Sequence, residues 1–141
     1  MGNLRPGTYS LRLAAEPSPL VGVQGFSPGV YSIVLNGENK IWVVSQTDDG
    51  NYTLSIQGGA PLFVQDEDGN LVANARPPPT VFVIDGPDGG PNVIRVPNSN
   101  KVWTVLTPYA PESSVWKIFL EDLVKDPQVP EIQKWYFVIP Q

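Results

Sequence analysis

The chain has 141 residues, a formal net charge of −5, and neither cysteine nor histidine. This length suits one domain with its own core, and the two absences exclude disulfides, cysteine nucleophiles and catalysis by a histidine base. Nine scattered Lys and Arg give no basic surface for a phosphate backbone, so we expect no nucleic-acid partner.

The chain carries no targeting signal that we recognise. Residues 1–6 include no apolar stretch suited to a signal peptide, and no apolar run approaches the length that spans a membrane. We therefore expect a cytoplasmic protein without a membrane partner. No motif calls for a cofactor, and nothing indicates an obligate dimer, so we expect a monomer.

Sixteen prolines, thirteen glycines and no helical periodicity favour an all-β fold. In the first third of the chain, Asn36-Gly37 predicts a hairpin turn before a strand at Trp42, and residues 24–29 predict a loop. The strands that we expect, in chain order, are 7–13, 20–23, 30–35 and one at Trp42, then 52–56, 61–65, 71–75 and 80–85, then 93–96, 101–106, 114–120 and 134–139.

An aromatic strand occurs three times along the chain. Its copies are Ile41-Trp42-Val43-Val44, Val81-Phe82-Val83-Ile84 and Trp135-Tyr136-Phe137-Val138, and we align them on Trp42, Phe82 and Tyr136. A second strand type recurs in step with it, starting at Gly7, Gly50 and Gly90. The pattern predicts one domain, 1–141, built from three repeats of four strands at about 7–49, 50–89 and 90–141.

The repeats differ most between their third and fourth strands. The first repeat uses residues 36–39 there, the second uses 76–79, and the third uses 121–133. A connection that long in a small domain is usually functional or disordered. Any function should therefore be sought first in 121–133.

Three repeats of four strands with matched aromatics resemble the β-trefoil. The opening from Leu4 to Leu11, the Trp-x-Val strand and the lack of cysteine resemble the fungal (mushroom) β-trefoil serine protease inhibitors related to cospin and cnispin, and more distantly the mycocypins. Ricin-type lectins would instead show Gln-x-Trp in each repeat, and no Gln lies two residues before Trp42, Phe82 or Tyr136.

The resemblance implies an inhibitor of trypsin-type or chymotrypsin-type serine proteases that acts through one exposed loop and has no catalytic activity. The loops that such inhibitors use correspond here to 24–29 and 121–133. In the second of these, Lys125 is the only basic residue between Lys117 and Lys134, and it suits a pocket with a carboxylate at its base.

We therefore expect Lys125 to anchor the loop. Leu123, Val124, Asp126 and Pro127 would shape the approach, and the prolines would limit loop freedom. Asp126 is a poor neighbour for an acidic enzyme cleft. The alternative is a solvated connection in which residues 121–125 form one helical turn.

The second candidate loop consists of Gly25, Phe26, Ser27 and Pro28, with Phe26 suited to a chymotrypsin-type pocket or to packing on the barrel. Arg76 is set aside because Pro77 follows it. Residues 66–70 predict a hairpin turn rather than a calcium loop, so we expect no metal.

Two other functions stay open. A carbohydrate-binding β-trefoil lectin would use exposed Trp, Asp and Asn in shallow pockets, although the strand positions of the tryptophans favour core packing. A defensive storage protein or toxin would show neither activity.

Overall fold

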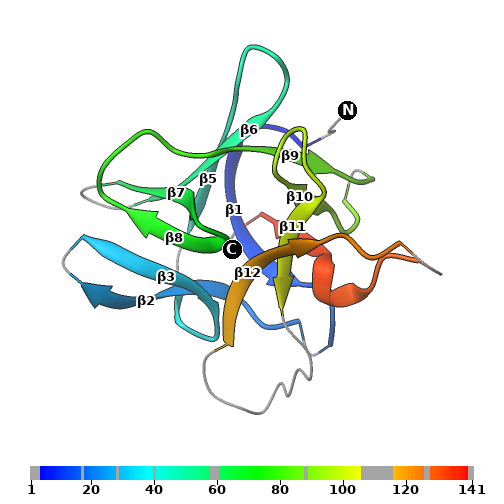
Figure 1. Cartoon of the computed structure of the whole chain (residues 1–141), viewed down its shortest axis with the longest axis horizontal. Helices are drawn as coiled ribbons and strands as arrows, with labels where there is room; N and C mark the ends of the chain where they lie inside the picture. The colour runs from blue at the N-terminus through cyan, green and yellow to red at the C-terminus, as the bar shows by residue number, and fades with distance from the viewer. Residues whose placement is uncertain are drawn as a thin grey trace.

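A computed structural model of the chain describes residues 4–16, 18–27, 29–39, 41–57, 61–87, 89–105, 116–125 and 128–139 (Figure 1). Within these residues it contains thirteen β-strands and a single 3₁₀ turn, so the all-β prediction is confirmed. The elements are β1 (Gly7–Leu13), β2 (Val21–Ser27), β3 (Val30–Leu35), β4 (Glu38–Asn39), β5 (Trp42–Gln46), β6 (Tyr52–Ile56), β7 (Leu62–Glu67), β8 (Asn70–Asn74), β9 (Val81–Asp85), β10 (Val93–Arg95), β11 (Lys101–Val105), β12 (Trp116–Asp122), η1 (Glu131–Gln133) and β13 (Trp135–Val138).

Six of the strands form a closed ring of antiparallel neighbours, in the order β1, β5, β6, β9, β10 and β13. The link between β10 and β13 is a pair of main-chain hydrogen bonds between Asn92 and Trp135, 2.7 and 2.8 Å long. Because closure pairs every strand of the ring on both sides, it leaves no free edge to which another chain could add.

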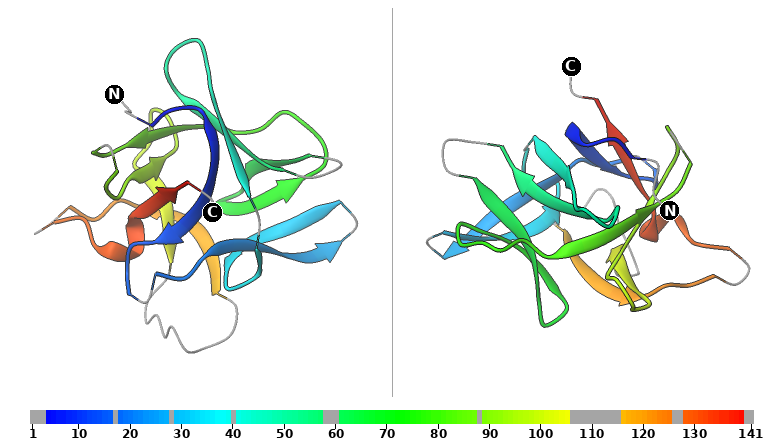
Figure 2. Two further views of the ribbon diagram at one scale, coloured as in Figure 1. Left: turned by 180° about the vertical axis from the view of Figure 1, so that it is seen from behind. Right: turned by 90° about the horizontal axis from the view of Figure 1, so that it is seen from above.

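The remaining long strands form three hairpins, β2–β3, β7–β8 and β11–β12. Their second strands meet in a triangle in which β3 pairs with β8, β8 with β12, and β12 with β3. Figure 2 shows the same arrangement from behind and from above. The hairpins therefore support one another as well as the ring.

The core lies where the inward side chains of the ring and the hairpins meet. Strand β6 shows why: Tyr52, Leu54 and Ile56 are buried, while the residues between them are partly exposed, because successive side chains point to opposite faces. The largest fully buried side chains are aromatic: Trp42, Trp103, Trp135, Tyr52 and Phe82. Their burial removes the most apolar surface from water and dominates the stabilisation of the fold.

The predicted alignment of Tyr136 with Trp42 and Phe82 is wrong by one residue. Trp135 is fully buried, whereas Tyr136 is half-buried and lies opposite Arg12 on β1. Trp42, Phe82 and Trp135 are therefore the equivalent residues. The correction matters because Gln133 lies two residues before Trp135, so the third copy does contain a Gln-x-Trp sequence.

Two turn predictions had different outcomes. The turn after β7 is confirmed: Asp68 and Gly69 both have positive φ, 55° and 87°, as a tight hairpin turn requires. The Asn36-Gly37 turn does not join paired strands as predicted. It leads into the two-residue β4, which pairs with β2, and Gly22 allows the close approach of Glu38.

Candidate functional site

The connection from β12 to β13 is the longest of the three that lead from a hairpin back to the ring. It comprises residues 123–134, against 36–41 and 75–80 at the other two positions. Its described parts project beyond the neighbouring strands in Figures 1 and 2. We call residues 123–130 the projecting segment.

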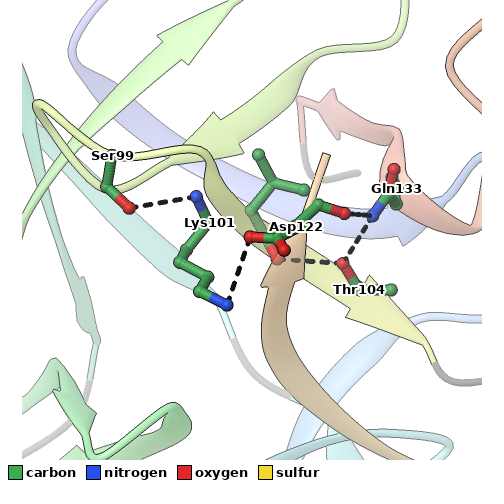
Figure 3. A network of polar contacts seen from close by, with 6 residues as sticks. Ser99, Lys101, Thr104, Asp122 and Gln133 are labelled. Atoms are coloured by element: carbon green, nitrogen blue, oxygen red, sulfur yellow. Dashed lines mark hydrogen bonds and ion pairs between the residues drawn. The ribbon is translucent and has the colours of Figure 1, made fainter. Parts of the chain in front are cut away.

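The side chain of Gln133 joins Asp122, the residue before the projecting segment, to Thr104 on β11 (Figure 3). Its side-chain Nε2 donates to the carbonyl oxygen of Asp122 at 2.9 Å, and its Oε1 accepts from the main-chain N–H of Val124 at 2.9 Å. The second Nε2 hydrogen is donated to Oγ1 of Thr104 on β11 at 3.0 Å. The amide thus joins the start of the segment to β11.

This arrangement is buried, since Gln133 is 2% exposed and Thr104 is 4% exposed. A buried amide must satisfy its hydrogen-bonding groups, and each lost partner costs about 1–3 kcal/mol. Both Nε2 hydrogens and the Oε1 acceptor have partners, so the orientation of the amide is determined by its surroundings. The base of the segment is therefore fixed.

The helical turn that the alternative interpretation placed at residues 121–125 does not form. Glu121 and Asp122 continue β12 in register with β11, and Leu123 N–H donates to the carbonyl oxygen of Asn100 at 2.9 Å. The helical turn is η1 instead, where Gln133 N–H donates to the carbonyl oxygen of Pro130 at 3.0 Å.

The candidate anchor lies just beyond the fixed base. Leu123 is half-buried, Val124 is 48% exposed and Lys125 is exposed. A depression of about 360 Å³ beside them is lined by Asp85, Arg95, Asn100, Leu123 and Lys125, among other residues. The other two predicted site residues, Asp126 and Pro127, lie outside the described residues.

Two ion pairs flank this region. Lys101 Nζ lies 3.2 Å from Asp122 Oδ1 at the end of β12, and Arg95 lies 3.6 Å from Asp85 across β9 and β10. The Lys101 and Asp122 side chains are more than half exposed, and exposed pairs of this kind contribute about 0–1 kcal/mol. The hydrogen bonds of Gln133, rather than these charges, hold the segment.

The predicted loop at residues 24–29 is largely strand. β2 continues to Ser27, Gly25 pairs with Tyr31 and Ser27 with Val30, with a bulge between Gly25 and Ser27. Gly25 is exposed, and Phe26 and Ser27 end the strand. The side chains of Phe26 and Ser27 lie outside the described part of the chain, and so does Pro28. This hairpin and the projecting segment lie at opposite sides of the molecule in Figure 1.

Arg76 is exposed, as expected, on a connection that is also braced by glutamine. Gln65 Nε2 donates to the carbonyl oxygens of Arg76 and Pro78, at 2.6 and 2.8 Å, and Arg76 N–H donates to Asn74 Oδ1 at 2.9 Å. Residues 75–80 therefore form a second stiff connection.

The prediction that the four tryptophans pack in the core is confirmed for three of them. Trp42, Trp103 and Trp135 are fully buried, and Trp116 is half-buried. The half-buried Phe119 lies beside two surface hollows. Phe119 and Asn70 line two depressions, one of about 340 Å³ where the three hairpins meet and one of about 460 Å³ between β7–β8 and β11–β12.

Sequence reasoning missed Gln133 and its partner Thr104. Misalignment of the third aromatic strand concealed Gln133, although Gln133-Lys134-Trp135 was visible as a Gln-x-Trp sequence. No residue pattern pointed to Thr104, because its role depends on which strand lies beside the segment.

Within the described ranges, no group of three or more Asp or Glu residues is placed to hold a metal ion. In the same part of the chain, no helix is long and apolar enough to cross a membrane.

No family model matches the chain, and no curated protein matches it significantly in sequence. Several solved structures match its fold, and two of them are described here. One is a proteinase inhibitor from Coprinopsis cinerea, with a TM-score of 0.76 and 21% identity over 98% of this chain and 100% of that chain. The other is a ricin B-like lectin from Macrolepiota procera in complex with lactose, with a TM-score of 0.70 and 18% identity over 98% of this chain and 99% of that chain.

Both neighbours are β-trefoil-type proteins, so the chain shares that type of fold. The resemblance to fungal proteinase inhibitors is thereby confirmed at the level of the fold. One neighbour is named as an inhibitor and the other as a lectin, and neither name describes an enzyme.

Proposed function

We propose that the protein inhibits serine proteases of the trypsin or chymotrypsin type, with the 121–133 connection as the inhibitory loop and Lys125 as its anchor. The observation that carries the proposal is the exposure of Lys125 on a projecting segment whose start is held by the buried side-chain amide of Gln133 and whose end is bonded to the main-chain N–H of the same residue. The fold shared with a proteinase inhibitor supports it.

The mechanism follows from the stiffness of the segment. A protease binds an extended stretch of chain and reads one side chain in its pocket; a trypsin-like pocket has a carboxylate that suits a lysine. A segment fixed before binding loses little conformational entropy when it docks, so more of the contact energy appears as affinity. A central lysine in such a contact can contribute about 2–4 kcal/mol, as interface hot spots do.

In this proposal the barrel is a support without catalytic activity. The closed ring and the triangle of hairpins would be three repeats of four strands, at about 7–49, 50–89 and 90–141, with β4 as an addition to the first. That the chain acts as a monomer in the cytoplasm stays a prediction from its sequence.

The test is a residual-activity assay of trypsin with the purified protein and with Lys125→Ala. We expect the wild type to inhibit and Lys125→Ala to lose inhibition, with an unchanged melting temperature because Lys125 is exposed. Lys117→Ala is the matched control, because Lys117 is also an exposed lysine and lies on β12. This variant should inhibit trypsin as the wild type does. Equal inhibition by Lys125→Ala would move the site elsewhere.

Carbohydrate binding is the second candidate, and the surface around Phe119 favours it. A half-buried aromatic ring lies there beside Asn70 and the exposed carboxylates of Asp66 and Asp68, which are groups suited to sugar hydroxyls. The lectin neighbour and the single Gln-x-Trp sequence are consistent with it. The buried tryptophans cannot serve as the sugar platform. Lactose titration followed by calorimetry separates the candidates: saturable binding with no effect on trypsin would favour the lectin.

A further inference from the structure

We propose that Gln133 is a positioning residue that sets the inhibitory geometry of the projecting segment without touching the protease. This inference rests on the proposed function. Gln133 is buried, so its effect on a partner must pass through the residues it holds.

The contacts of Gln133 lie close to the anchor. Its Oε1 accepts from Val124 N–H, and Val124 directly precedes Lys125. Its Nε2 donates to the carbonyl oxygen of Asp122, two residues earlier. One side chain thus holds the main chain before Lys125 at two residues, Asp122 and Val124.

The same residue fixes the end of the segment. Gln133 ends η1, and its own N–H donates to the carbonyl oxygen of Pro130 at 3.0 Å. Through Thr104 Oγ1, the amide is also tied to β11, the strand that pairs with β12. Gln133 therefore contacts both ends of the segment, the start through its side chain and the end through its main-chain N–H.

Leu123 N–H makes a separate hydrogen bond, to the carbonyl oxygen of Asn100 at 2.9 Å. That bond continues the β11–β12 ladder and does not involve Gln133. Loss of Gln133 should therefore free the segment from Val124 onward while leaving Leu123 paired, which is a local signature that general destabilisation would not produce.

The first experiment measures amide hydrogen exchange in the wild type and in Gln133→Leu, a variant of similar size that cannot form the bonds. We expect exchange at Val124 to become about 10- to 100-fold faster, because its acceptor is gone, while exchange at Leu123 changes much less. Unchanged exchange at Val124 would overturn the inference, whether or not the protein inhibits any protease.

The second experiment measures the inhibition constant for trypsin. Gln133→Leu should bind roughly 10- to 100-fold more weakly and should be cut after Lys125 faster than the wild type, because an unfixed segment loses more entropy on docking. Val64→Ala is the matched control, since it removes buried volume in β7, away from the segment, and should lower the melting temperature without weakening inhibition. Equal weakening in both variants would mean that Gln133 acts only through stability.

If Gln133→Leu does not fold, Gln133→Glu replaces it. The carboxylate keeps an acceptor for Val124 N–H but faces the carbonyl oxygen of Asp122 without a proton to donate, so inhibition at pH 8 should still weaken about 10-fold. Wild-type affinity in that variant would overturn the inference. If the wild type itself does not inhibit, the proposed function fails, and the exchange data alone decide whether Gln133 fixes the segment.

Discussion

The indole N–H of Trp135 donates to the main-chain carbonyl oxygen of Trp103 at 3.1 Å, and their rings meet edge to face with centroids 6.0 Å apart. Trp42 makes the corresponding bond to Val21 on β2 at 3.2 Å. In each case a ring strand is joined to the first strand of a hairpin. Phe82 occupies the equivalent place in β9 and has no N–H to donate.

Trp135→Phe should therefore lower the free energy of unfolding by about 2–4 kcal/mol, because it opens a cavity and leaves the Trp103 carbonyl group without its partner. Urea denaturation followed by circular dichroism measures the loss. Tyr136→Phe is the control, since Tyr136 is half-buried and should change stability by no more than about 0.5 kcal/mol. Similar losses in both variants would contradict the assignment of Trp135 as the core aromatic.

The sequence predicted several strands closely and one alignment wrongly, for a physical reason. Residues 30–35 and 52–56 alternate or cluster apolar side chains between turn formers, and β3 and β6 have those bounds. The run Trp135-Tyr136-Phe137 is aromatic throughout, so period-two alternation cannot tell which ring points inward. Only pairing with β1, which places Tyr136 opposite Arg12, decides it.

Part of the candidate site could likewise be predicted from the sequence, and part could not. That the third connection is the longest and that Lys125 is exposed could be predicted, although residues 121 and 122 belong to β12, because a long insertion in one repeat has few surfaces to cover it. The strand at 24–27 could not, because Gly25 and Ser27 are poor strand formers that pair only through β3. The role of Gln133 depends on Thr104, 29 residues away in sequence, and on the path of β11.

Gly22 permits the close approach of β4 to β2. A Cβ atom at this position would lie 2.1 Å from the carbonyl oxygen of Glu38, a main-chain atom that can move only if β4 moves. Gly22→Ala should cost about 1–3 kcal/mol of unfolding free energy, as overpacking does. Gln24→Ala, at an exposed position in the same strand, should cost far less. A thermal melt that shows no difference between the two variants would contradict the packing of β4 on β2.

Tyr52 should make the protein sensitive to alkali. Its side chain is 1% exposed, its hydroxyl group donates to the carbonyl oxygen of Leu4 at 2.6 Å, and burial raises its pKa above the ordinary value of 10.0. When the folded pKa is raised, the unfolded chain loses its proton first. The stabilisation is complete below pH 10 and is lost as the pH rises toward the folded pKa.

Tyr52→Phe removes this titration. The variant should be about 1 kcal/mol less stable than the wild type at pH 7, because it lacks the hydrogen bond to Leu4, and the difference should shrink above pH 10. Chemical denaturation at several pH values between 7 and 11 measures both quantities. A stability difference that stays constant or grows across this range would show that Tyr52 is not the titrating group.

The central claim is that a protease reads the side chain of residue 125, and an exchange of that side chain tests it most directly. Lys125→Phe should lose inhibition of trypsin and gain inhibition of chymotrypsin, with the fold unchanged because residue 125 is exposed. Titration of both enzymes with the wild type and the variant gives the answer in one assay. A variant that inhibits each enzyme as the wild type does would contradict the account.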